Sequence, residues 1–123
     1  MISYVLVGTN DVKRAAAFYD KLLAEVGAKR LWESERGIAW GVSEDEPSLG
    51  IVTPYDGKAA SVGNGVMVAL AASSRDQVDR VYRKAIELGG KDEGPAGPRG
   101  DGGYYAGYFR DLDGNKLSVF FGG

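Results

Sequence analysis

Tyr19-Asp20-Lys21 in the first half of the chain returns as Tyr82-Arg83-Lys84 in the second half. The spacing is 63 residues (82 − 19 = 63), and the same spacing brings Gly27 onto Gly90. Each copy is a short strand–helix unit that is too small to bury its apolar face alone, so units of this kind are stable only when they pack together. The repeat therefore predicts one structure built from two paired modules.

The composition is that of an ordinary globular protein and excludes several classes of function. The chain has 123 residues, 44% of them hydrophobic, with a net charge of −2, which fits one domain and argues against nucleic acid as a partner. No long apolar run predicts a membrane span or a signal peptide, so the cytoplasm is the expected location and no membrane partner is expected. The absence of cysteine and histidine excludes disulfides, thiolate nucleophiles and imidazole bases.

Apolar periodicity predicts two helices and a set of short strands. The first apolar stripe runs from Val12 to Val26, with Asn10 or Asp11 as its N-cap and Gly27 at its end. The second stripe follows a Ser74–Gln77 capping box and stops at Gly89 or Gly90. Strands are expected at residues 2–8, 29–33, 38–42, 49–53, 66–71, 104–110 and 116–121. Residues 94–103 are expected to be a flexible loop. The first module then spans 1–57, a linker 58–65 and the second module 66–123.

Two motifs carry a resemblance to a known family. They are Ala16-Ala17-Phe18-Tyr19 and Gly103-Tyr104-Tyr105-Ala106-Gly107-Tyr108-Phe109-Arg110-Asp111-Leu112-Asp113-Gly114-Asn115-Lys116. In this order they resemble the glyoxalase/bleomycin-resistance/dioxygenase family, also called the vicinal oxygen chelate family. The resemblance implies an α+β fold in which two pseudo-symmetric βαβββ modules form a cup-shaped mixed sheet. It also implies a homodimer.

The resemblance implies four metal-ligand positions, on the first and fourth strand of each module, where relatives carry His, Glu or Gln. These positions map here to Tyr4, Gly50, Met67 and Ser118. A phenol, a thioether, a hydroxyl and a residue without a side chain do not form the nitrogen and carboxylate ligand set that a divalent cation needs. The sequence therefore predicts a chain without a metal ion at these positions and without a cofactor.

Alternation along the strands predicts which side chains line the cup, because every second residue of a strand points to the same face. The expected lining is aromatic and apolar with a few hydroxyl groups, and it consists of Tyr4, Leu6, Trp40, Gly50, Met67, Tyr108, Ser118 and Phe120. Trp40 and Tyr108 are included as paired positions on the third strand of each module. Such a surface suits a flat or hydrophobic organic molecule.

Three functions compete on these observations. The preferred hypothesis is a metal-independent protein that sequesters or carries a small aromatic or hydrophobic compound. The alternative is an enzyme of the lyase or dioxygenase type with a non-standard metal site, or with Tyr4 or Tyr108 as a metal-free acid–base group. The third is an interaction module whose cup is filled by its own side chains. Arg99 and Asp101 could close over a ligand, whereas Arg110-Asp111 is expected to be a structural ion pair or turn anchor.

Overall fold

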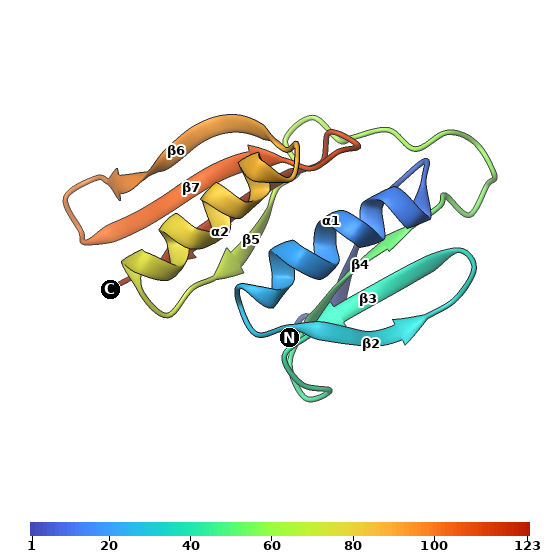
Figure 1. Cartoon of the computed structure of the whole chain (residues 1–123), viewed down its shortest axis with the longest axis horizontal. Helices are drawn as coiled ribbons and strands as arrows, with labels where there is room; N and C mark the ends of the chain where they lie inside the picture. Colours follow the sequence, from blue (N-terminus) through green and yellow to red (C-terminus); the bar gives the residue numbers. More distant parts are fainter.

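The computed structural model describes residues 1–123 and contains two modules of the same kind, each a four-stranded sheet with one helix (Figure 1). The first module consists of β1 (Tyr4–Gly8), α1 (Val12–Ala24), β2 (Lys29–Glu33), β3 (Gly37–Gly41) and β4 (Ser48–Val52). The second consists of β5 (Val68–Ala71), α2 (Arg75–Glu87), β6 (Lys91–Arg99), β7 (Tyr104–Arg110) and β8 (Lys116–Phe121). The predicted α+β fold with two βαβββ modules is confirmed.

The two sheets have the same topology. Their strand orders are β1-β4-β3-β2 and β5-β8-β7-β6, with the first pair of each sheet parallel and the others antiparallel. No strand of one sheet pairs with a strand of the other, so the mixed sheet consists of two separate four-stranded parts. The modules meet instead through α1 and α2, which pack side by side in front of the strands in Figure 1.

Both helices begin and end where local chemistry predicts. Asp11, not Asn10, caps α1, because its side chain accepts a hydrogen bond from the Arg14 N–H. Gly27 follows the helix with a φ of 78°, a conformation that glycine adopts without strain. Ser74 caps α2 by accepting from the Gln77 N–H. Neither helix is long and apolar enough to cross a membrane.

The expected flexible loop at 94–103 is wrong over most of its length, because β6 continues to Arg99 and pairs with β7. Gly94, Pro95 and Pro98 weaken any strand prediction, since proline cannot donate to a ladder and glycine costs entropy. β6 is the edge strand of its sheet, where proline is tolerated, and its pairing shows two register shifts between Asp92 and Gly97. Only the turn at 100–103 stays outside the strands.

One core joins the two modules. It lies between the helices and the faces of the sheets that the helices cover, and the two helices contribute to the same buried cluster. Its largest fully buried members come from both halves of the chain: Trp40, Tyr19, Phe109, Leu22, Ile51, Leu117, Val78, Val81 and Val119. The helix-covered faces are therefore filled by the protein's own side chains.

A buried carboxylate between β7 and β8 ties the modules together. Asp111 is 5% exposed, and its Oδ2 accepts a hydrogen bond from the Tyr19 hydroxyl of α1 at 2.6 Å. Its two oxygens also accept from the Asp113 N–H, the Asn115 N–H and the Asn115 side-chain amide, each at 2.9 Å. Burial, followed by the charge of Asp111, raises the pKa of Tyr19 well above its ordinary value, so this phenol stays a proton donor.

The same turn also holds the start of the first module. The Asn115 amide donates to the carbonyl oxygen of Gly8 at 2.8 Å, and the Asn10 N–H donates to the Asp113 carboxylate at 3.1 Å. Arg14 pairs with Asp113 at 3.4 Å. We call Tyr19, Asp111 and Asn115 the inter-module clamp. The expectation that Arg110-Asp111 forms a turn anchor or ion pair is correct for Asp111, whereas Arg110 pairs with Glu93 instead.

We expect Tyr19→Phe to lower the free energy of unfolding by about 2 kcal/mol, because it leaves a buried carboxylate without one of its donors. Tyr82→Phe is the matched control, since Tyr82 is the repeat partner of Tyr19 but its hydroxyl donates to the exposed Asp92. Urea denaturation of both variants measures the difference. Equal losses of stability in the two variants would contradict the assignment of the clamp.

Candidate functional site

Each sheet has one face without a helix, which we call the open face. In β1, Val5 and Val7 pack against the core, whereas Tyr4 and Leu6 point the other way and are 60% and 47% exposed. Because both helices lie on the same side of the molecule, both open faces lie on the opposite side. The predicted orientation of β1 is therefore correct, and its two large side chains have no cover within the chain.

The second sheet repeats this arrangement. Leu117 and Val119 of β8 are core residues, and the intervening Ser118 pairs in register with Ala69 of β5 and Tyr108 of β7. These residues form one row on the helix-free side of the sheet, but Ser118 is 2% exposed, so the prediction that its hydroxyl lines the cup is wrong, because neighbouring side chains cover it. Met67, just before β5, and Phe120 of β8 are 44% and 39% exposed. The Phe120 ring also contacts the Tyr104 ring, with centroids 5.5 Å apart.

Gly50 lies on the open face of the first sheet, where it leaves room for Leu6. A Cβ atom at Gly50 would lie 2.8 Å from the Leu6 side chain and 3.4 Å from the Cβ of Ala39. Small residues therefore form the centre of this face, and the Leu6 side chain lies over them. Gly50 forms part of the face through its backbone only, as expected from a residue without a side chain.

The prediction that Trp40 lines the cup is wrong. Its indole is 2% exposed and lies on the helix side of β3, against the Tyr19 ring. The indole N–H donates to Asp20 of α1 at 2.8 Å. Hydrogen bonds from Arg30, followed by the bond from Trp40, lower the pKa of Asp20, which keeps this carboxylate charged. Trp40 is therefore a core residue that fixes α1 to the sheet.

Trp40 was placed on the wrong face because the β3–β4 and β7–β8 connections differ in length by one residue. Trp40 pairs with Leu49, and its structural counterpart Phe109 pairs with Leu117. The paired positions are nine residues apart in the first module (49 − 40 = 9) and eight apart in the second (117 − 109 = 8). A shift of one residue turns every side chain of a strand to the opposite face. Tyr108 therefore corresponds to Ala39, which lies on the open face of the first sheet, and Trp40 corresponds to the core residue Phe109.

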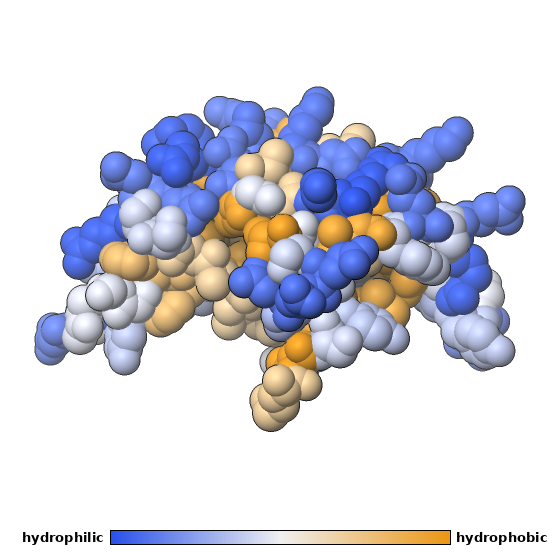
Figure 2. All heavy atoms as spheres, turned by 90° about the horizontal axis from the view of Figure 1, so that it is seen from below, coloured by the Kyte–Doolittle hydropathy of each residue, from blue (hydrophilic) through white to orange (hydrophobic).

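Figure 2 shows the molecule from below Figure 1, with the helix side uppermost. Hydrophilic atoms cover the upper side, and hydrophobic atoms gather toward the lower side, where the open faces lie. The exposed large hydrophobic residues include seven from the open faces and their edges: Ile2, Tyr4, Leu6, Trp32, Met67, Tyr104 and Phe120. Patches of this kind mark binding surfaces in soluble proteins.

The four mapped ligand positions do not fit a divalent cation. Tyr4 and Met67 are largely exposed, Ser118 is buried, and Gly50 has no side chain. The donors are a phenol, a thioether and an alcohol, none of which replaces imidazole or carboxylate. No group of three acidic side chains elsewhere in the chain is arranged to hold a metal ion either. We therefore derive no chemical step through a metal.

Two cationic side chains lie against the Tyr108 ring and a third lies nearby on the same strand, and sequence reasoning missed this cluster. The Arg99 guanidinium carbon and the Lys116 Nζ lie 5.4 and 5.8 Å from the centre of the Tyr108 ring. Arg110 lies on the same strand as Tyr108, two residues further on. A cavity of about 320 Å³ opens beside Lys116 and Arg110, under the linker segment 62–67. Residues 62–67 are far in the chain from Arg110 and Lys116, so no local pattern in the sequence signals this cavity.

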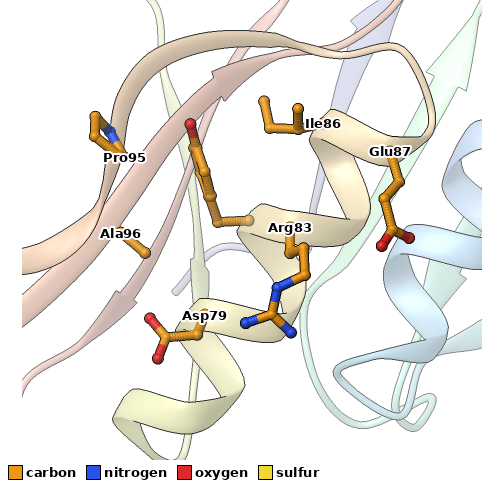
Figure 3. Close-up of a pocket in the computed structure, with 7 residues that line it drawn as sticks. Asp79, Arg83, Ile86, Glu87, Pro95 and Ala96 are labelled. Atoms are coloured by element: carbon orange, nitrogen blue, oxygen red, sulfur yellow. The ribbon is translucent and has the colours of Figure 1, made fainter.

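A second cavity, of about 390 Å³, lies on the helix side between α2 and β6. Figure 3 shows Asp79, Arg83, Ile86 and Glu87 on the helix, facing Pro95 and Ala96 on the strand. Tyr82 also lines this cavity, and its hydroxyl donates to Asp92 at 2.7 Å. Desolvation, followed by this hydrogen bond, raises the pKa of Tyr82 to about 12. Asp79 likewise accepts from Tyr105, so these polar groups are already satisfied within the protein.

Comparisons with known proteins identify the family. The chain belongs to the glyoxalase/bleomycin resistance protein/dioxygenase superfamily, whose family model matches residues 1–119. A crystal structure of a glyoxalase/bleomycin resistance protein from Albidiferax ferrireducens T118 is 34% identical, with a TM-score of 0.90 and 98% of each chain covered. No curated protein matches the chain.

More distant structures share the fold alone. The fosfomycin resistance protein FosX from Listeria monocytogenes is 17% identical, with a TM-score of 0.75, and the match covers 100% of this chain and 93% of that one. Lactoylglutathione lyase from Agrobacterium tumefaciens is 19% identical, with a TM-score of 0.70 and coverages of 99% and 93%. These two structures thus agree with the predicted fold, whereas the predicted family is confirmed by the family model and the 34% identical structure.

The orientation of β3 can be tested by fluorescence, because the chain has two tryptophans on opposite faces. We expect the Trp32→Phe variant, which keeps buried Trp40, to emit at shorter wavelength and to resist quenching by acrylamide. The Trp40→Phe variant keeps Trp32, which is 54% exposed, and serves as the comparison. Quenching of Trp40 as efficient as that of free tryptophan would show that it faces solvent.

Proposed function

We propose that this chain binds a small aromatic or apolar organic molecule on its open faces, without a metal ion at the four mapped positions. The observation that carries the proposal is the exposure of Tyr4, Leu6, Met67 and Phe120 in a molecule whose core is otherwise closed. All four belong to the lining expected from strand alternation. Each such side chain gains about 1.5–3 kcal/mol when it is fully buried, which favours a ligand or partner that covers it.

The names of two similar structures support a small-molecule site on this fold. They refer to fosfomycin and to lactoylglutathione, both small organic compounds. At 17% and 19% identity those structures say nothing of which compound this chain binds. The donor chemistry at the mapped positions separates the proposal from metal-assisted reactions, because none of these side chains could hold the Lewis acid.

We also propose that a second copy of the chain closes the site as a homodimer. Both open faces point to the same side of the molecule, so one chain cannot fold its two sheets over a shared ligand. A two-fold axis would place the first sheet of each copy opposite the second sheet of its partner. The contact would bury Tyr4 and Leu6 against Met67 and Phe120 and create two equivalent sites.

The binding proposal can be tested with N-phenyl-1-naphthylamine, a neutral aromatic dye whose fluorescence rises in apolar surroundings. We expect saturable binding to the wild-type protein, and about tenfold weaker binding to Tyr4→Ser and to Phe120→Ser, because each loses one buried aromatic contact. Tyr55→Ser is the control, since Tyr55 is 92% exposed on the linker between the modules. The absence of saturable binding to wild-type protein would overturn the proposal.

The dimer proposal can be tested by sedimentation velocity over a range of concentrations. We expect a dimer for the wild-type protein and a monomer for Leu6→Asp, because a carboxylate on the open face cannot be buried without a partner. Ile86→Asp is the control, since Ile86 is a partly exposed residue of α2 on the helix side. A monomeric wild-type protein, or dissociation caused equally by Ile86→Asp, would contradict this interface.

A further inference from the structure

The cavity of about 320 Å³ beside the second open face has an unusual lining. It lies between the linker segment and the facing ends of β7 and β8, where Arg110 and Lys116 pair in register. Val66 and Met67 supply apolar surface, and Asn64 supplies an amide. No acidic residue lines this cavity, although acidic residues outnumber basic ones in the chain as a whole.

Much of the hydrogen-bonding capacity of these side chains is unused. Arg110 donates through Nε to Glu93 and through Nη1 to the carbonyl of Gly114, each at 2.9 Å, which leaves Nη2 without a partner. Lys116 takes part in no ion pair and no side-chain hydrogen bond. Its ammonium group makes a cation–π contact with the Tyr108 ring. An ammonium group has three donors, so Lys116 can offer all of them to a ligand.

We propose that the molecule bound on the open face is an organic anion, whose charged group is held by Lys116, Arg110 and Asn64. This rests on the proposed function and names the chemical class of its ligand. The acidic group, a carboxylate, phosphate or sulfonate, lies in the cavity, and the aromatic or apolar part extends over Met67 toward Tyr108. Arg99, on β6 at the other edge of β7 from Lys116, adds a third positive charge near the Tyr108 ring.

Electrostatics favours an anion over a neutral group in this cavity. A ligand or a second chain that fills the cavity would remove water from Lys116. A cation that loses water without gaining an opposite charge carries a large penalty, whereas a charge-assisted hydrogen bond to an anion offsets it. Because the cavity has no acidic lining, the ligand itself has to supply the negative charge. A neutral hydrophobic ligand gains nothing from Lys116 and leaves the cavity to water.

Two dyes that differ by one charged group provide the test. 1-Anilinonaphthalene-8-sulfonate is N-phenyl-1-naphthylamine with an added sulfonate, so the pair isolates the contribution of the anion. We expect Lys116→Gln to weaken binding of the sulfonate dye about tenfold or more and to change binding of the neutral dye less than about twofold. Added salt should weaken the binding of the sulfonate dye only, because salt screens the contact between charges.

Two further variants keep this test independent of folding defects. Asn64→Asp, on the exposed linker, places a negative charge in the cavity without altering a strand. We expect it to weaken the binding of the sulfonate dye and not that of the neutral dye. Lys21→Gln removes a positive charge from the helix side and should leave both dyes unaffected.

The outcomes separate the two proposals. If the neutral dye binds saturably but Lys116→Gln and Asn64→Asp do not change the affinity for the sulfonate dye, the proposed anion site is wrong and the proposed function stands. If neither dye binds the wild-type protein, both proposals fail. Selective loss of the sulfonate dye in both variants supports the anion site, and displacement of that dye by benzoate or by phenyl phosphate would identify the preferred acid group.

Discussion

The hydrogen bond from the Tyr19 hydroxyl to the Asp111 carboxylate is the interaction on which the arrangement of the modules depends. Asp111 is a buried charge that receives donors from the helix of one module and the turn of the other, and Asn115 extends the contact to the carbonyl of Gly8. A buried carboxylate persists only when its oxygens are satisfied in this way. The clamp therefore fixes α1 against the second sheet and keeps both helices on one side of the molecule.

The clamp also shows how the internal repeat has diverged. Tyr82 is the repeat partner of Tyr19, yet its hydroxyl donates to Asp92 within its own module and makes no contact across the modules. At the other end of the helix pair, the Gln77 amide donates to the carbonyl of Glu25, close to the contact between Arg80 and Glu25. Equivalent residues thus have different partners, so a sequence repeat predicts shared local structure but not shared contacts.

Placing both helices on one side leaves both open faces uncovered on the other, and this connects the fold to the proposed function. The first open face is shallow and apolar around Leu6 and Gly50, whereas the second combines Met67 and Phe120 with the cations near Tyr108. A molecule with an aromatic body and an acidic group matches the combined surface. The two copies of the module would then have separate tasks, one supplying apolar contact and the other also recognising charge.

The amino-acid sequence predicted the family, the two modules, both helices with their caps, and most strands, because these depend on local periodicity and short motifs. It also identified which residues of β1 and β8 face away from the core, since alternation is local. The burial of Trp40 was not predictable, because the β3–β4 connection is one residue longer than the β7–β8 connection, which makes Trp40 the counterpart of buried Phe109 and not of Tyr108. Only the tertiary structure brought Asn64 to Arg110 and Lys116, since contacts between distant segments depend on how the chain closes and leave no periodic pattern.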